Sequence, residues 1–315
     1  MDKKGILKKF FESGVLLTPR ALEKIDDSNA DFFHKKSQEN SGPVFSLDNI
    51  EKETLKVVVK KTAQKEKITP QDLAEYYKNK YNGTKRLLLE KIRQPISIKN
   101  SARQIVDVGL IAMVRELTPT GFLIEDGTGK LEVLSKKHTV AEDDVVGLVG
   151  SIKEGGTLVE KEIIFPDVPD NNRIKKIERA KILLAEEPDV CNTNVDYIIA
   201  IRAKETTKNV ITNLTNPAKI SFSRGNNEIV VVVYDPQKNT TLQEATQYLV
   251  KRHLSPTMEL VKDTEDHFLL DPPPDILWVL SENKWAKTYK GITVLSCGSG
   301  SALINLETRE IEFID

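Results

Sequence analysis

The sequence contains few of the side chains that usually build redox or metal chemistry. Among its 315 residues, cysteine occurs only as Cys191 and Cys297, and histidine occurs four times. Two cysteines are too few for a disulfide framework, or for a zinc site made of paired Cys-x-x-Cys motifs. We therefore predict that both are thiols in a hydrophobic core.

The sequence also lacks an excess of charge and a long apolar run. Its 46 basic and 47 acidic residues leave a net charge of -1. Binding to nucleic acid rests largely on basic side chains that neutralise phosphates, so it would need a local patch here. The apolar residues near the N-terminus are interrupted by Lys8, Lys9 and Glu12, unlike the core of a signal peptide. These features predict an intracellular protein.

What the sequence does contain is typical of several globular domains. Hydrophobic residues make up 39% and charged residues 30%, and a chain of this length usually forms more than one core. We predict a multidomain α+β protein with three regions. They are a helical N-terminal region with a polar linker over 1–95, a barrel over 100–170, and an α/β domain over 171–315.

The N-terminal region is predicted to be helical in two places. A Thr-Pro pair before residues 20–25 is typical of a helix start. The polar segment 26–43 is predicted to be a loop or linker. A second helix is predicted from Thr69, which is a good N-cap, and Asn82-Gly83 is predicted to interrupt it.

The middle region changes to a strand-like pattern. Five short apolar runs, separated by Gly, Asp, Thr or Lys, predict five strands within 105–168. The pair Asp126-Gly127 predicts a tight turn between the second and third strands, because glycine tolerates a positive φ. This number of strands over this length predicts an OB-fold, a five-stranded barrel.

The C-terminal region alternates helical and strand patterns. A helical stretch is predicted over 173–187 and a helix over 241–254. Apolar runs at 196–201, 227–235 and from 275 onward predict strands buried on both faces, as in layered α/β domains.

Several motifs, taken in order, resemble the small subunit of archaeal family D DNA polymerase. They include EDGTGKLEVL, the barrel ending IIFPDVP, and then VVVYD, YLVKRHLSP, PPPDI and INLETREIEFI. The resemblance covers roughly 70–315. It implies an OB-fold followed by a calcineurin-like phosphoesterase domain with two divalent metal ions, such as manganese, and 3'-5' exonuclease activity. It also implies a heterodimer with a large catalytic subunit, DNA contact through that complex, and a cytoplasmic, nucleoid-associated protein of DNA replication.

The positions that correspond to the family's metal ligands depart from its pattern. They are occupied by Ala203, Glu205, Asp235, Ser281 and Asn283, and no Gly-Asn-His-Asp motif occurs. Two-metal hydrolysis needs converging Asp, His and Asn ligands. We therefore predict an inactivated exonuclease with no catalytic residues, no metal and no other cofactor.

Two histidines remain in the C-terminal region. His253 lies in the family-like motif RHLSP and is a candidate residual ligand, although a lone histidine is more often structural. His267 lies in a charged segment and is predicted to be solvated. A residual phosphodiesterase that uses Asp196, Glu205, Asp235 or His253 is the alternative to an inert scaffold.

The N-terminal segment contains a candidate sliding-clamp motif. Leu7, Phe10 and Phe11 have the spacing of an aliphatic residue followed by two aromatics, but Lys4 replaces the usual Gln. The same spacing places these side chains on one helical face, so packing onto residues 20–25 explains them equally well.

Three functions are consistent with the sequence. The first is a non-catalytic scaffold that binds the large polymerase subunit, and the second is the residual exonuclease. The third is a free single-strand-binding protein. Phe122 and Phe165 are the only aromatics of the barrel region, and single-strand binders usually need aromatic stacking platforms.

Overall fold

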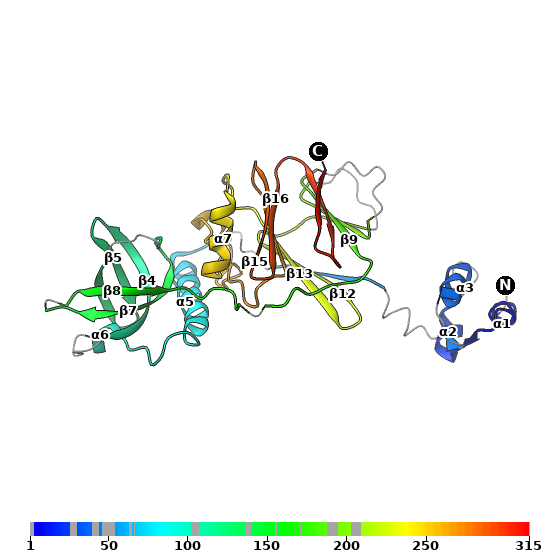
Figure 1. Ribbon diagram of the computed structural model, residues 1–315, viewed down its shortest axis with the longest axis horizontal. Coiled ribbons are helices and arrows are strands. Elements are labelled where there is room, and N and C mark those ends of the chain that lie inside the picture. The colour runs from blue at the N-terminus through cyan, green and yellow to red at the C-terminus, as the bar shows by residue number, and fades with distance from the viewer. Residues whose placement is uncertain are drawn as a thin grey trace. The chain divides into compact units, whose positions relative to one another are not determined.

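The computed structural model describes residues 3–25, 30–39, 44–45, 54–62, 65, 67–101, 107–135, 140–154, 156–170, 172–187, 195–202 and 209–314. The chain divides into two compact units, residues 1–58 with 222–228, and residues 59–221 with 229–315. Figure 1 shows the elements of both units. Among the described residues, no helix is long and apolar enough to cross a membrane.

The N-terminal unit consists of short helices around a small core. Its elements are α1 (Lys3–Glu12), α2 (Pro19–Lys24), α3 (Ala30–Glu39) and a parallel pair of strands, β1 (Leu16–Leu17) and β2 (Val44–Phe45). Ile6 and Phe10 of α1 share this core with Ala21 of α2. The predicted packing of the first helix on the second is therefore confirmed, and Thr18 caps α2 as expected.

The predicted loop over 26–43 is wrong, because α3 occupies most of it. The side of α3 that faces the core carries Ala30 and the buried Ser37, while His34 meets the Phe10 ring edge-on at 5.2 Å. Small and polar residues at these positions remove the apolar periodicity that indicates a helix in sequence.

Helix α5 (Pro70–Leu88) is longer than predicted. Thr69 and Asp72 form a capping box at its start, which confirms the predicted N-terminus. The predicted interruption at Gly83 is wrong, since the helix runs through it. A Cβ atom at this position would lie 2.8 Å from Cδ2 of Leu269. Gly83 therefore allows close packing against another segment.

The barrel contains the five predicted strands. They are β4 (Val108–Thr118), β5 (Gly121–Asp126), β6 (Gly129–Leu134), β7 (Val145–Ile152) and β8 (Leu158–Ile164). They close in the order β4-β5-β6-β8-β7, and only β6 and β8 pair in parallel. Alternating apolar side chains fill the interior, with Leu110, Phe122 and Leu148 fully buried. The short helix α6 (Ile98–Ser101) contacts β6.

The predicted turn at Asp126-Gly127 is confirmed, although its stabilisation differs from expectation. Gly127 is not among the glycines with positive φ. The Asp126 carboxylate accepts hydrogen bonds from the Thr128 N–H at 2.7 Å and the Gly129 N–H at 3.1 Å. The aspartate side chain therefore fixes this turn, as is common for Asx turns.

The other described strands form two sheets. The five-stranded sheet has the order β11-β10-β9-β17-β18, and the six-stranded sheet has the order β15-β16-β14-β13-β12-β3. Their strands are β3 (Lys56–Lys60), β9 (Lys181–Ala185), β10 (Tyr197–Ala200), β11 (Val210–Ile211), β12 (Ala218–Arg224), β13 (Asn227–Tyr234), β14 (Ile276–Val279), β15 (Lys284–Tyr289), β16 (Ile292–Cys297), β17 (Ser301–Asn305) and β18 (Ile311–Ile314).

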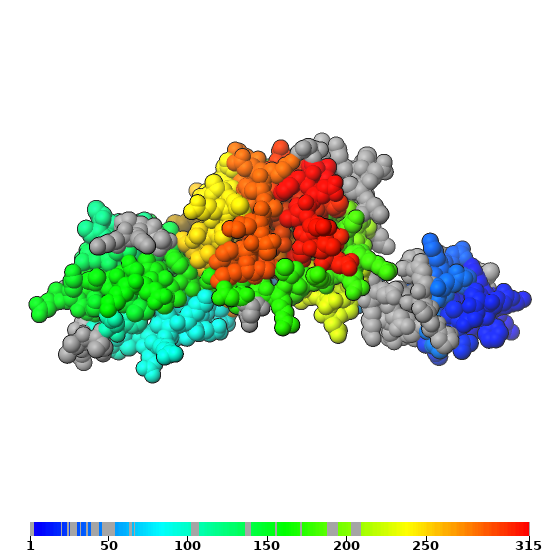
Figure 2. Space-filling model, in the orientation of Figure 1, coloured from blue at the N-terminus to red at the C-terminus, as the bar shows by residue number. Residues whose placement is uncertain are grey.

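The two sheets meet where β16 ends. Cys297 is buried, and its thiol contacts the Leu184 carbonyl oxygen of β9 at 3.8 Å. Burial raises the pKa of this thiol to about 12. Cys297 is therefore a core thiol as predicted, while Cys191 lies outside the described residues. The exposed side chains of the C-terminal part of the chain form one continuous surface (orange to red in Figure 2).

Most elements of the predicted α/β region are confirmed. Helix α7 (Leu242–Lys251) begins at the capping box of Thr241 and Glu244, and the 3-10 turn η1 (Met258–Leu260) follows it. The predicted helical stretch over 173–187 is wrong. Its apolar part is β9, which pairs with β10 in parallel and with β17 in antiparallel fashion. Strand pairing in a buried sheet overrides the helix propensity of this segment.

Candidate functional site

The carboxyl ends of three parallel strands meet at one edge of the six-stranded sheet. Strand β14 pairs in parallel with both β13 and β16. The loops that follow these strands surround an open depression of about 490 Å³. Its lining is polar and comprises Glu186, Asp235, Gln237, Lys238, Asn239, Leu280, Ser281, Glu282, Gly298 and Ser299. Strand ends of α/β sheets are the usual place for a ligand site.

Two of the sequence-predicted positions, Asp235 and Ser281, lie together in this depression. Asn283 lies next to them, because its amide approaches Asn239 Oδ1 at 3.5 Å. Ala203 and Glu205 lie outside the described residues. The topology therefore brings the described members of the predicted set to one edge.

Asp235 is held by a neighbouring loop through its backbone. Asn216 Nδ2 donates to the Asp235 carbonyl oxygen at 2.6 Å, and the Asp235 N–H donates to Asn216 Oδ1 at 3.0 Å. The Asp235 carboxylate accepts a hydrogen bond from the Gln237 N–H at 2.8 Å. One carboxylate oxygen thus stabilises the turn after β13.

Ser281 fastens the end of β14 to the loop before α7. Its hydroxyl accepts the Thr240 N–H at 3.1 Å and can donate to Asn239 Oδ1 at 2.7 Å or to the Thr240 carbonyl at 2.8 Å. Trp285 Nε1 donates to that same carbonyl at 3.2 Å. The family resemblance implies a metal ligand at this position. Ser281 instead joins the end of β14 to the loop before α7 through hydrogen bonds.

The hydrogen bonds of Ser281 predict that Ser281 contributes more to stability than Asn283. Ser281→Ala leaves the buried Thr240 N–H without its partner, so we expect a loss of about 1 to 2 kcal/mol in the free energy of unfolding. Asn283→Ala removes one long contact of an exposed side chain, and we expect a change within about 0.5 kcal/mol. Urea denaturation of the two variants measures this difference, and equal losses would contradict the assigned role.

No metal-ligand set is found at the depression among the described residues. Three of its lining residues carry carboxylates, but only Asp263, Glu265 and His267 form a group of three potential ligands within 4.8 Å of one another. That group lies in the segment before β14 and shares no residue with the lining of the depression.

Asp196 is separated from Asp235 by the topology. Asp196 precedes β10, and its carboxylate accepts the Lys181 N–H at the start of β9 at 2.8 Å. Glu186, by contrast, follows the carboxyl end of β9 and lines the depression. Because β9 and β10 are parallel, Asp196 lies at the opposite end of its sheet. The structure does not bring it together with Asp235.

His253 is also remote from the depression. Helix α7 starts directly after its N-cap Thr241 and spans ten residues before the turn that carries His253, a length of about 15 Å. The side chain is buried. Its Nδ1 accepts the Ser255 N–H at 2.9 Å, and its Nε2 lies 3.2 Å from Asp266 Oδ1.

These partners assign the protonation state of His253. Nδ1 accepts a hydrogen bond, so the ring hydrogen is on Nε2 and is donated to Asp266. Burial lowers the pKa of His253 below its ordinary value, against the opposing effect of Asp266. The neutral ring has no free lone pair for a metal ion, so its structural interpretation is supported over that of a residual ligand.

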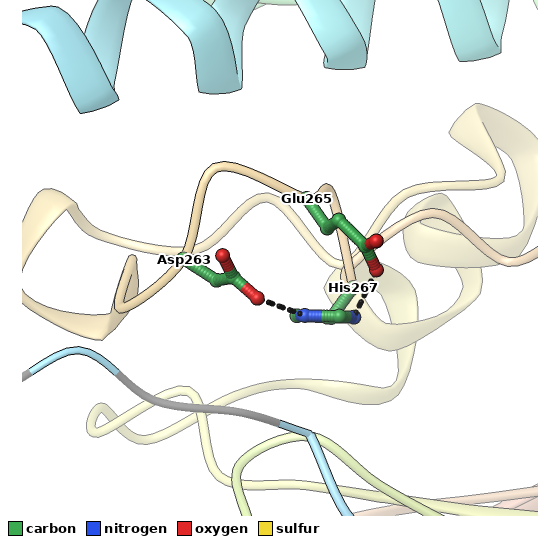
Figure 3. A group of neighbouring side chains, drawn as sticks. All are labelled: Asp263, Glu265 and His267. Carbon is green, nitrogen blue, oxygen red and sulfur yellow. Dashed lines mark hydrogen bonds and ion pairs between the residues drawn. The ribbon is translucent and has the colours of Figure 1, made fainter.

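The expectation that His267 is solvated is wrong. Its side chain is 22% exposed and lies between two carboxylates of its own segment (Figure 3). Asp263 Oδ2 lies 2.9 Å from Nε2, and Glu265 Oε2 lies 3.9 Å from Nδ1. Since one ion binds only one ring nitrogen, carboxylates at opposite edges of the ring favour a hydrogen-bonded histidine over a metal centre.

The residues of the candidate clamp motif differ in exposure. Phe10 is fully buried and packs against Phe45, with ring centroids 6.0 Å apart. Leu7 is 40% exposed and Phe11 is 71% exposed. Binding of all three side chains in a pocket of a partner would require Phe10 to leave the core of its unit.

Sequence reasoning missed the residues that organise the loops around the depression. Asn216 and Asn239 bind the backbone of Asp235 and the side chain of Ser281, respectively. The available signal was the position of polar residues directly after apolar strand patterns, where loops of α/β sheets converge. The buried Lys80 and Asp266 had no signal, because each lies among other charged residues in sequence.

The comparisons with known proteins give one relative. The chain is 22% identical over 191 residues to the DNA polymerase II small subunit of Thermoplasma acidophilum. The aligned region covers 54% of this chain and 39% of that protein. The chain therefore spans about two fifths of the length of this relative. No family model matches the chain.

Proposed function

We propose that this chain is a non-catalytic accessory subunit of an archaeal family D DNA polymerase, which acts in DNA replication by binding the large polymerising subunit. The similarity to a DNA polymerase small subunit supports the assignment. The observation that carries the non-catalytic part is the depression at the ends of β13 and β14. Its side chains bond to one another and to the loops around it, and its described residues supply no convergent metal ligands.

The barrel is proposed to be an OB-fold. Its support is the order β4-β5-β6-β8-β7, in which the first strand pairs with both the second and the fourth. Closure through one parallel pair, β6 with β8, fits a five-stranded Greek-key barrel.

The two sheets of the second unit are proposed to be a calcineurin-like phosphoesterase domain that has lost its metal site. Its support is the mixed α/β topology with the depression at the strand ends, where the loops would deliver metal ligands in a functional enzyme. Asp235, Ser281 and Asn283 lie at that edge without histidine partners.

The barrel also favours a scaffold over a free single-strand-binding protein. Phe122 is fully buried in the barrel core, and Phe165 is partly buried against the same core. Neither is placed as a stacking platform for bases. Residues 108–164 carry ten acidic and six basic side chains, a balance that repels phosphates.

Two measurements test the proposed function. Co-expression with a family D large subunit is expected to yield a stable complex, and failure to co-purify would contradict the assignment. The purified chain is expected to show no manganese-dependent degradation of a 3' end. Robust cleavage that Asp235→Ala abolishes would establish the residual exonuclease in place of the scaffold.

A further inference from the structure

Helix α5 is joined to the segment between η1 and β14. We refer to residues 261–271 as the clasp loop. Asn79 Nδ2 of α5 donates to the Thr264 carbonyl at 2.9 Å, and Arg86 forms an ion pair with Asp271. Gly83 lies close to Leu269, as described above. One face of α5 therefore contacts the clasp loop along about two turns.

A set of charged side chains is buried around this contact. Lys80 of α5 is 6% exposed, and Asp266 of the clasp loop is one of the carboxylates that act on it. Lys251, at the end of α7, pairs with Asp144 of the barrel at 2.6 Å. Charged groups that are buried together away from water interact strongly, and an uncompensated charge among them is costly.

The charges of this set do balance when His253 is neutral. Two cations and two carboxylates make up the set: Lys80 and Lys251 with Asp144 and Asp266. Arg115 and Asp143 pair with each other at 3.4 Å, but their side chains are 34% and 38% exposed and Arg115 also pairs with Glu125, so they lie outside the buried set. The neutral imidazole of His253 donates to Asp266 and adds no charge.

Three buried polar atoms at this contact lack a hydrogen-bond partner. Tyr76 Oη and Thr84 Oγ1 of α5 and Asp266 Oδ2 of the clasp loop are buried and have no hydrogen-bond partner. Each such atom opposes the buried arrangement, because it has lost water without gaining a protein partner. An added buried charge would therefore raise the free energy of a contact that already contains unsatisfied polar atoms.

We propose that protonation of His253 opens the contact between α5 and the clasp loop, so that this joint is sensitive to acid. The added proton gives the balanced buried set a net positive charge. Opening lets water reach the imidazolium, Lys80 and Asp266, and it satisfies the polar atoms that lack partners. The proposal is independent of the polymerase assignment.

The groups that face His253 come from three elements. Asp266 of the clasp loop attracts the imidazolium, Lys80 of α5 repels it, and Asp144 before β7 attracts it more weakly. Phe268 lies beside the ring, with centroids 6.5 Å apart. Burial acts most strongly of all and lowers the pKa of His253 in the closed state.

The direction of the effect follows from linkage. In the open state the histidine titrates near 6.5, while in the closed state it stays neutral to lower pH. The closed state is therefore fully favoured above about pH 6.5 and is disfavoured increasingly as the pH falls below that value. At pH 5.5 the opening constant is expected to rise by up to about tenfold, the limit set by an open-state pKa near 6.5.

Hydrogen exchange of the full chain tests this expectation. After correction for intrinsic exchange rates, the protection of peptides from α5 is expected to fall between pH 7.5 and 5.5, by up to about tenfold. Peptides from β14 in the sheet core are expected to keep their protection. A pH-independent protection of α5 would overturn the proposal.

Three variants separate His253 from other titrating groups. His253→Gln is expected to remove the pH dependence, and Lys80→Met to weaken it, because the removed lysine charge offsets that of the imidazolium. The matched control His267→Gln changes the histidine of the clasp loop itself and is expected to keep the full response. Loss of the response in His267→Gln would assign the effect to the other histidine and overturn the proposal.

A direct titration guards against variants that fail to fold. Nitrogen-detected NMR of the imidazoles in the unmodified chain is expected to show the hydrogen of His253 on Nε2 at pH 7.5, with protonation well below pH 6.5. Protonation at or above pH 6.5 would overturn the proposal. So would a zinc- or manganese-induced shift of the His253 resonances, because it would show a free lone pair on that ring.

Discussion

Arg252→Met is expected to lower the free energy of unfolding by about 3 kcal/mol. The Arg252 side chain is buried. Its Nε and Nη2 donate to the Leu270 carbonyl oxygen at 3.0 and 2.8 Å, and Nη2 also donates to Asp271 Oδ1 at 3.0 Å. Methionine fills much of the volume but leaves a buried carbonyl and part of a carboxylate without donors.

Arg86→Met is the matched control for this loss. Arg86 pairs with the same aspartate, Asp271, but its side chain is 69% exposed. Surface ion pairs contribute about 1 kcal/mol or less, so we expect a change below that value. Urea denaturation of both variants measures the difference. Similar losses would show that the charge near Asp271, and not the buried geometry of Arg252, sets the stability.

Gly121→Ala is expected to destabilise the barrel by about 3 kcal/mol, at the upper end of overpacking costs. Gly121 begins β5 and pairs with Leu134 of β6. A Cβ atom there would lie 1.8 Å from the Val133 carbonyl oxygen and 3.0 Å from the Ser135 nitrogen. Both atoms belong to the backbone, so a strand must move to relieve the contact.

Gly127→Ala controls for the loss of a glycine in the same sheet. A Cβ atom at Gly127 meets nothing within 4 Å, and Asp126 holds the turn through its own carboxylate. We expect a change within about 0.5 kcal/mol. Urea denaturation followed by far-ultraviolet circular dichroism compares the two variants. A midpoint for Gly121→Ala equal to that of Gly127→Ala would contradict the packing argument.

The barrel could be predicted from sequence because its strands carry their own signals. Short apolar runs mark β4 to β8, and turn residues separate them, so local pattern and tertiary role agree. In the segment that forms β9, the local sequence pattern and the tertiary role disagree. Its neighbours Arg173 to Lys181 are rich in helix-forming charged residues, and only pairing with β10 and β17 makes it a strand.

Other elements could not be predicted from sequence, because their residues contact segments that lie far away along the chain. Phe33 is the large apolar residue of α3 that packs against the core, while Ala30 and Ser37 beside it are small, so the sequence shows no extended apolar period. Gly83 was interpreted as a helix stop, because glycine usually lowers helix stability. Its actual role depends on Leu269, which lies far along the chain and cannot be inferred from neighbouring residues.

The candidate site could be located only in part. The family resemblance pointed to Asp235 and Ser281, and the structure places both at one edge. It did not indicate that Asn216 and Asn239 bind them. The neutral state of His253 depends on Ser255 and Asp266 together, and such a state follows from three-dimensional contacts and not from residue type.

The close approach of Leu269 to Gly83 has a mechanical consequence for α5. Sliding of the helix along its axis would place a side chain larger than hydrogen against Leu269, so glycine marks one allowed axial position. A helix of 19 residues is about 28 Å long. The same helix contacts β4 and β7 of the barrel, so its axial position relative to the clasp loop also fixes where the barrel strands meet it.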